Sequence, residues 1–117
     1  MSRHDDQISM RQMLDYARQA RVMVLDRERP DLDSDLMLQL ALTRLVEIIG
    51  EAATRVSGPT SDKYPQIPWS HIVGMRNRLI HGYDVIDLNL LWDTVKIDLP
   101  PLISAREEIL SMRARDV

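Results

Sequence analysis

Apolar residues recur at intervals of three and four along most of the chain, and this spacing is typical of amphipathic helices. A first helix is predicted from about Asp6 to Asp26. The stretch that closes with Pro30 ends it, because proline disfavours helix at the residue before it. A second helix is predicted from about Asp35 to Val56. The residues that could cap its N-terminus are Asp31, Asp33 and Ser34.

The second helix carries a wide apolar surface. One stripe of apolar residues follows the helical period, and three more apolar residues lie well off it: Leu36, Leu40 and Ile48. A surface this wide indicates burial on two sides or a surface for a partner. Ser57-Gly58-Pro59 then predicts the end of the helix, because glycine followed by proline is a common stop signal.

The second half of the chain predicts a loop and two further helical stretches. The loop covers residues 60–68 and contains two prolines, and a third helix is predicted from Trp69 to its end at Gly82. A final helix begins near Asp87 as its N-cap. Pro100-Pro101 are expected to kink or break it before the helical pattern continues, and residues 113–117 are expected to fray.

No stretch shows the alternation of apolar and polar residues that is typical of a β-strand, and no internal repeat stands out. Four or five helices joined by short loops predict an all-α fold, an antiparallel four- to five-helix bundle. A length of 117 residues predicts a single domain over residues 1–117. Trp69 and Trp92 are interpreted as core or interface anchors of this bundle.

Composition and charge narrow the possible functions. The chain contains no cysteine, which excludes disulfides, thiolate nucleophiles and cysteine-bound zinc. No apolar run is long enough to span a membrane, and the N-terminus lacks the apolar core of a signal peptide, so a cytoplasmic protein without membrane contact is expected. The net charge of −3 predicts that any contact with nucleic acid is local, since broad electrostatic binding needs a basic face.

One short segment, residues 75–84, gathers two arginines, an amide, a histidine, a tyrosine and an aspartate around a glycine. Asn77 and His81 are four residues apart and share a helix face, so the amide can hydrogen-bond one imidazole nitrogen. Arg76 and His81 are five residues apart, which is roughly 140° around a regular helix. A two-fold dimer would bring Arg76 of one chain toward His81 of the other.

These residue types suit the cleavage of RNA without a metal ion. The reaction needs a base for the 2′-OH, an acid for the leaving oxygen and positive charge at the phosphate. Histidine transfers protons near neutral pH, and arginine binds phosphate oxygens through paired N–H groups. His4 and His71 are isolated from other expected ligands, so neither a metal nor a cofactor is expected.

The segment resembles the active-site motif of the HEPN superfamily: Arg76, then four residues, then His81, with Asn77 directly after the arginine. With Tyr83 two places after the histidine, it is similar to the HepT-like toxins of that superfamily. Three further segments are also similar to that family, so the resemblance covers nearly the whole chain: residues 44–53, 64–69 and 91–95.

The resemblance implies a HEPN-like helical bundle that forms a two-fold homodimer, with two motifs facing one cleft. It implies an endoribonuclease toxin with Arg76 and His81 as the catalytic pair, Asn77 in support and RNA as substrate. The partner that it implies is a minimal nucleotidyltransferase antitoxin. That enzyme would silence the toxin by attaching AMP to Tyr83.

Other interpretations stay open. The same dimer could act mainly as the binding partner and substrate of a nucleotidyltransferase, or it could be purely structural. His81 could be an ordinary histidine favoured by the dipole at a helix C-terminus, and Tyr83 could simply pack its ring at a helix end. Glu47 and Glu51 lie one turn apart and are interpreted as partners of surface arginines, not as metal ligands.

Overall fold

A computed structural model describes residues 5–82 and 85–112, and every regular element in these two stretches is helical. The predicted all-α class is therefore confirmed. In chain order the elements are α1 (Asp6–Met23), α2 (Arg29–Ser34), α3 (Leu36–Thr54), α4 (Gly58–Asp62), α5 (Trp69–His81), α6 (Leu88–Asp93), the π-helical turn η1 (Thr94–Asp98), α7 (Leu99–Ser104) and α8 (Arg106–Leu110).

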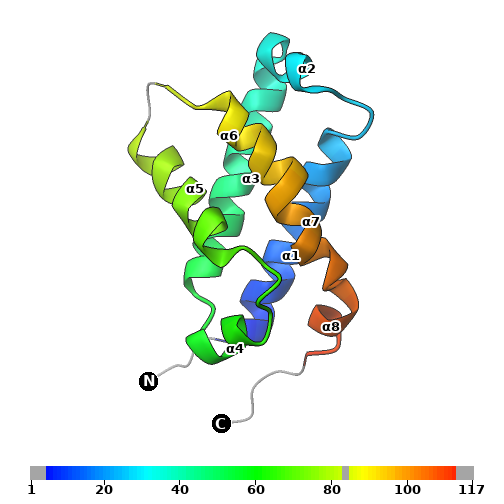
Figure 1. Cartoon of the computed structure of the whole chain (residues 1–117), viewed down its shortest axis with the longest axis vertical. Helices are drawn as coiled ribbons and strands as arrows, with labels where there is room; N and C mark the ends of the chain where they lie inside the picture. The colour runs from blue at the N-terminus through cyan, green and yellow to red at the C-terminus, as the bar shows by residue number, and fades with distance from the viewer. Residues whose placement is uncertain (1–4, 83–84, 113–117) are drawn as a thin grey trace.

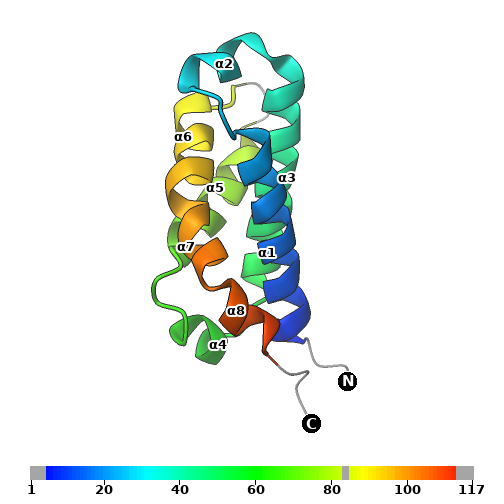
Figure 2. The same cartoon turned by 90° about the vertical axis from the view of Figure 1, so that its right-hand side faces the viewer.

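The helices run up and down the long axis of the molecule in the order α1, α3, α5 and the α6–α8 segment (Figure 1). Helix α3 packs against both α1 and α5, and α1 also packs against α7. In the perpendicular view, α1 and α3 lie side by side, with the α6–α8 segment next to them (Figure 2). This arrangement confirms the predicted antiparallel bundle.

The core lies where the apolar faces of these helices meet. Burying one large apolar side chain stabilises a fold by about 1.5–3 kcal/mol, so a shared core holds even helices too short to be stable alone. The large side chains that are less than 2% exposed include Met10, Met13, Leu14, Leu42, Ile49, Ile72, Leu91, Leu99 and Leu102.

Helix α1 ends at Met23, earlier than the predicted Asp26, and the unpredicted helix α2 follows it. The chain turns at Asp26, whose φ of 61° lies in the left-handed region that aspartate tolerates better than most residues. Pro30 lies in the first turn of α2, where a missing N–H costs no hydrogen bond. The Glu28 N–H donates to the Asp31 carboxylate at 2.8 Å. Pro30 therefore starts a helix, whereas it was expected only to follow one.

Helix α3 begins directly after Asp35, close to its predicted start. The Asp35 carboxylate accepts a hydrogen bond from the Leu38 N–H at 3.0 Å and pairs with Arg27 at 3.0 Å. The Leu38 bond first, and then Arg27, hold the pKa of Asp35 below its ordinary value. The N-cap is thus Asp35 itself, and the three candidates predicted ahead of it were wrong.

The wide apolar surface predicted for the second helix is only partly covered in this chain. The side chains of Leu36, Met37 and Leu40 are 66%, 81% and 57% exposed, whereas Ile48 is half-buried. Burial on two sides within the chain is therefore wrong for Leu36 and Leu40, and a partner surface stays a prediction. Despite this apolar face, no helix within the described part of the chain has the length and hydropathy needed to cross a membrane.

Helix α4 lies partly in the stretch that was predicted as loop. The Ser57 hydroxyl caps it by accepting a hydrogen bond from the Thr60 N–H at 3.4 Å, and Pro59 occupies its first turn. The buried Asp6 carboxylate ties this corner to α1. It accepts hydrogen bonds from the Ser57 N–H at 3.1 Å and from the Ser57 and Thr60 hydroxyls at 2.5 Å each.

Pro100 and Pro101 interrupt the regular α-helix, as predicted, but the change begins upstream of them in η1. A π-helical turn widens the backbone, and the two prolines then lie in the first turn of α7, where an N–H is not required. The chain therefore stays helical through both prolines. Residues 113–117, which were expected to fray, lie outside the described residues.

Candidate active site at the end of α5

Helix α5 carries the predicted catalytic pair and its supporting amide. Its apolar face packs on α3 and holds the helix in place; the buried residues of this face are Ile72, Met75 and Leu79. The helix ends at Gly82, as predicted, where the Gly82 N–H donates to the Arg78 carbonyl at 2.9 Å. His81 therefore lies in the last turn, at the edge of the bundle.

Arg76 points from α5 toward α3, and two side chains hold its guanidinium. One terminal nitrogen donates to Glu51 Oε2 at 2.5 Å, and the other donates to Asn77 Oδ1 at 2.8 Å. The Arg76 side chain is 25% exposed, so it still reaches solvent, and it lines a cavity. An arginine held in this way presents a fixed, charged hydrogen-bonding surface to an anion.

Asn77 was expected to hydrogen-bond His81, and the structure gives it a different partner. Its amide oxygen accepts from Arg76, the preceding residue. The guanidinium is a charged donor, and charged hydrogen bonds are stronger than the neutral bond that an imidazole would make. Asn77 therefore supports the arginine of the pair and leaves the histidine tautomer unassigned.

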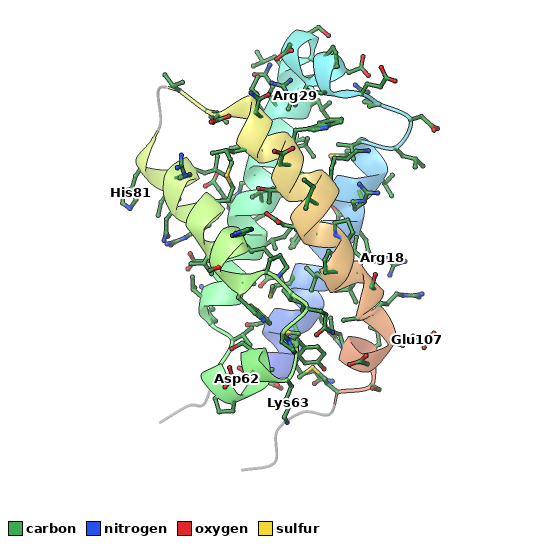
Figure 3. The ribbon with its side chains drawn as sticks, in the orientation of Figure 1. Arg18, Arg29, Asp62, Lys63, His81 and Glu107 are labelled. Carbon is green, nitrogen blue, oxygen red and sulfur yellow. The ribbon has the colours of Figure 1, made fainter. Side chains whose placement is uncertain are left out.

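His81 is exposed and projects away from the bundle at the end of α5 (Figure 3). It borders a cavity of about 300 Å³ between the end of α5 and the start of α6. Arg78, Val85 and Asp87 line the same cavity. A histidine in this place is open to a large polymer such as RNA, which a closed pocket would exclude.

Arg76 borders a different cavity from His81. That cavity measures about 330 Å³, lies among α1, α3 and α5, and is also lined by Arg44, Glu47 and Glu51. The two cavities share no lining residue. Within one chain, the predicted pair therefore borders two separate cavities.

Tyr83, the residue predicted to receive AMP, lies outside the described residues, as does Asp84. The residues that line the cavity beside His81 include Gly82 and Val85, which flank these two positions in the sequence. The sequence prediction for Tyr83 therefore stays a prediction.

The two glutamates of α3 pair with arginines, as interpreted from the sequence. Glu47 contacts Arg44 at 3.9 Å, and Glu51 contacts Arg55 at 3.6 Å as well as Arg76. Over residues 5–82 and 85–112, no group of three histidine, cysteine, aspartate or glutamate side chains is placed to hold a metal ion.

Sequence reasoning missed the contact between Glu51 and Arg76, which are 25 residues apart. Helical spacing assigned Glu51 only to neighbours on its own helix, because a contact between helices leaves no trace in that spacing. One signal was available. Gly50 lies inside a helix, where glycine is destabilising by about 0.5–1 kcal/mol, and such a position indicates close packing of another backbone.

Comparison with known proteins gives a consistent family match. A family model described as "Ribonuclease HepT-like" matches residues 13–109. A protein of Methanocaldococcus jannaschii that bears the name "Putative RNase" is 35% identical over 102 residues. These residues are 87% of this chain and 94% of that protein. A protein of Thermococcus cleftensis, named by inference as a ribonuclease HepT, is 39% identical over 79 residues, or 68% of this chain and 72% of that protein.

A protein of Caldanaerobacter subterraneus subsp. tengcongensis is also named as an RNase by inference, and it is 36% identical over 80 residues. The match covers 68% of this chain and 71% of that protein. No solved structure matches the chain. The family model covers residues 13–109, which include Arg76 and His81, so the likeness to the family includes the candidate site.

Proposed function

Because the chain belongs to the HepT-like ribonuclease family, we propose that it is a metal-independent endoribonuclease that acts as the toxin of a cytoplasmic toxin–antitoxin system. The observation that carries this proposal is the end of α5, where an exposed histidine follows a fixed arginine by five residues. These groups suit proton transfer and phosphate binding. The names of the relatives support a ribonuclease activity.

In the proposed reaction, the imidazole of His81 takes the proton of a ribose 2′-OH. The 2′ oxygen attacks the adjacent phosphorus, and the bond from phosphorus to the 5′ oxygen breaks. The leaving 5′ oxygen takes a proton from the His81 imidazolium that the first step forms. The products are a 2′,3′-cyclic phosphate and a 5′-OH, and Arg76 donates hydrogen bonds to the phosphate oxygens as negative charge builds on them.

A second copy of the chain completes the proposed site. Arg76 and His81 border separate cavities of one chain, and a two-fold axis would set Arg76 of one protomer against His81 of the other. The exposed side chains of Leu36, Met37 and Leu40 support a homodimer, because apolar patches on α-helical surfaces mark sites of association.

The proposal predicts that the protein, free of any modification, cleaves RNA in EDTA about as fast as in magnesium, because no step uses a metal ion. The measurement is cleavage of labelled messenger and transfer RNA fragments, with mass spectrometry of the new ends. We expect 2′,3′-cyclic phosphate and 5′-OH termini. The matched control is the same RNA with one 2′-deoxy nucleotide at the cleavage position, which removes the attacking group and should block cleavage there.

Cleavage of the deoxy substrate at that position would contradict the 2′-OH mechanism. Loss of all cleavage in EDTA would contradict metal independence. If the unmodified protein cuts no RNA under any of these conditions, the result would favour the alternative function. In that function, the dimer is mainly the binding partner and substrate of a nucleotidyltransferase.

We further propose that a minimal nucleotidyltransferase antitoxin silences the protein by attaching AMP to Tyr83. Tyr83 follows His81 by two residues, so an added nucleotide there would place bulk and negative charge beside the candidate site. Co-expression with a nucleotidyltransferase encoded beside the gene is expected to raise the intact mass by one or more AMP units. Tyr83→Phe, the matched variant, should show no gain, and a gain that persists in it would place the modification elsewhere.

A further inference from the structure

We propose that Gly50 and Glu51, two consecutive residues of α3, form a seat that fixes the Arg76 guanidinium in the orientation that binds the scissile phosphate. Glu51 is then a positioning residue, because it acts on RNA only through Arg76. This inference rests on the proposed ribonuclease function and adds two residues from a different helix to its site.

The first observation is that two side chains accept hydrogen bonds from the guanidinium. Glu51 Oε2 accepts from one terminal nitrogen of Arg76 at 2.5 Å, while Asn77 Oδ1 accepts from the other at 2.8 Å. Two contacts on a planar group fix both its tilt and its rotation. Arginine has five N–H donors, so these bonds leave three for a phosphate. A free arginine would have to lose that rotational freedom when RNA binds.

The second observation is the close approach of the two helices at this point. A Cβ atom on Gly50 would overlap the Cβ of Arg76, and it would lie 2.9 Å from the Arg76 Cγ and 3.1 Å from the Ile72 carbonyl oxygen. Only glycine therefore lets the stem of Arg76 lie directly on the backbone of α3. This packing fixes the base of the side chain, and Glu51, the next residue, fixes its end.

The charged side chains around the seat allow an anion to bind in the cavity beside Arg76. The cavity beside Arg76 is lined by three arginines, Arg44, Arg55 and Arg76, and by two glutamates, Glu47 and Glu51. Arg55 contacts Glu51 at 3.6 Å and offsets part of its charge. The glutamate therefore does not cancel the positive charge of the cavity, although the whole chain carries a net charge of −3.

Exposed ion pairs contribute little to stability, so the Glu51–Arg76 pair is not explained as a support of the fold. The side chains are 44% and 25% exposed. If Glu51 orients Arg76, its loss weakens binding of the transition state more than binding of the RNA. If Glu51 instead competes with the phosphate for Arg76, its loss should improve cleavage. The two roles predict opposite changes.

The test compares cleavage by the full-length wild-type protein, Glu51→Ala and Glu51→Gln. We expect Glu51→Ala to lower kcat about tenfold or more with KM within about twofold, because misplacing a catalytic group by an ångström costs up to a hundredfold. Glu51→Gln should recover part of the rate, since its amide oxygen can still accept from Arg76. The matched control is Asp33→Ala, which removes an exposed pair of similar length, 2.9 Å to Arg29, and should leave kcat unchanged.

Coupling to Arg76 separates positioning from a general structural effect. In an Arg76→Lys background, Glu51→Ala should change kcat little further, since the group that it positions is already lost. Gly50→Ala should also lower kcat, whereas Gly74→Ala on α5 should not, because a Cβ there meets nothing within 4 Å. Additive losses in the double variant, or a wild-type kcat in Glu51→Ala, would overturn the proposal.

A second measurement does not depend on cleavage. In ¹⁵N spectra of the arginine side chains, the Arg76 terminal nitrogens, assigned with Arg76→Lys, should give separate signals only while the guanidinium is held. These signals should merge in Glu51→Ala and stay separate in Asp33→Ala. If the wild type cleaves no RNA, the ribonuclease proposal fails and the spectra alone decide whether the seat holds Arg76. Spectra that are identical in wild type and Glu51→Ala overturn the seat.

Discussion

Replacing His81 with alanine is expected to lower RNA cleavage by roughly 10²- to 10⁴-fold, because it removes the group that transfers protons in the proposed reaction. The fold should survive, since His81 is exposed in the last turn of α5. The matched control is His71→Ala. His71 is also an exposed histidine on α5, but it contacts Asp98 at 3.5 Å, away from the candidate site, and its loss should leave cleavage unchanged.

Mixed dimers can show whether the site is shared between two chains. Arg76→Ala alone should lower cleavage by roughly 10²- to 10³-fold, as expected for the loss of a donor to a charged transition state. If Arg76 and His81 act across a two-fold axis, a dimer of one Arg76→Ala chain and one His81→Ala chain has one intact site. Random mixing of the two variants should then restore roughly a quarter of wild-type activity.

A site contained within one chain gives a different result, because every chain in the mixture carries one defect. Mixed protein should then be as inactive as either variant alone. This outcome would contradict the shared site, and it would require Arg76 and His81 to meet within a single chain, which the separate cavities that they border do not favour.

Replacing Asp6 with alanine is expected to destabilise the fold by about 2–4 kcal/mol, because the residue is only 8% exposed and its carboxylate accepts three hydrogen bonds from Ser57 and Thr60. Its removal leaves those donors at a half-buried corner without their charged acceptor. Urea unfolding monitored by circular dichroism measures the change. Since Asp6 links α1 to a residue 51 positions away, the loss should lower the stability of the whole bundle.

Asp5→Ala serves as the control for this prediction. Asp5 is the N-cap of α1 and accepts from the Gln7 N–H at 2.9 Å, a local contact whose loss costs about 1 kcal/mol. Asp6→Asn should fall between the two, since an amide oxygen accepts without a charge. Equal unfolding midpoints for Asp5→Ala and Asp6→Ala would show that the Asp6 contacts add nothing beyond a helix cap.

The hydrophobic period predicted the long helices well, because burial of one helix face leaves a repeat in the sequence. The third helix and its end at Gly82 are clear cases. The short helices α2 and α4 were missed for a physical reason. Both have a proline in their first turn, and a proline can follow the end of one helix or lie at the start of another. Spacing alone does not show which of these a given proline does.

In the candidate site, too, the sequence predicted some features and missed others. The place of the proposed catalytic pair on α5 was predicted from local sequence, since it depends only on helix geometry. The partners of Arg76 were not. Glu51 reaches it from another helix, and Asn77 bonds the arginine beside it instead of the histidine one turn away. These hydrogen-bond partners depend on how the helices pack and on which donor is charged. The spacing of residues along one helix predicts neither.

The two ends of the described chain are clasped together. The Gln7 side-chain amide donates to the Met112 carbonyl at 2.6 Å, and Arg11 donates to the Leu110 carbonyl at 2.9 Å. The start of α1 and helix α8 lie at the foot of the long axis (Figure 1), whereas His81 lies toward its other end (Figure 3). The two ends of the described chain could therefore be joined by a short linker, and the backbone reopened in an exposed connection away from the candidate site.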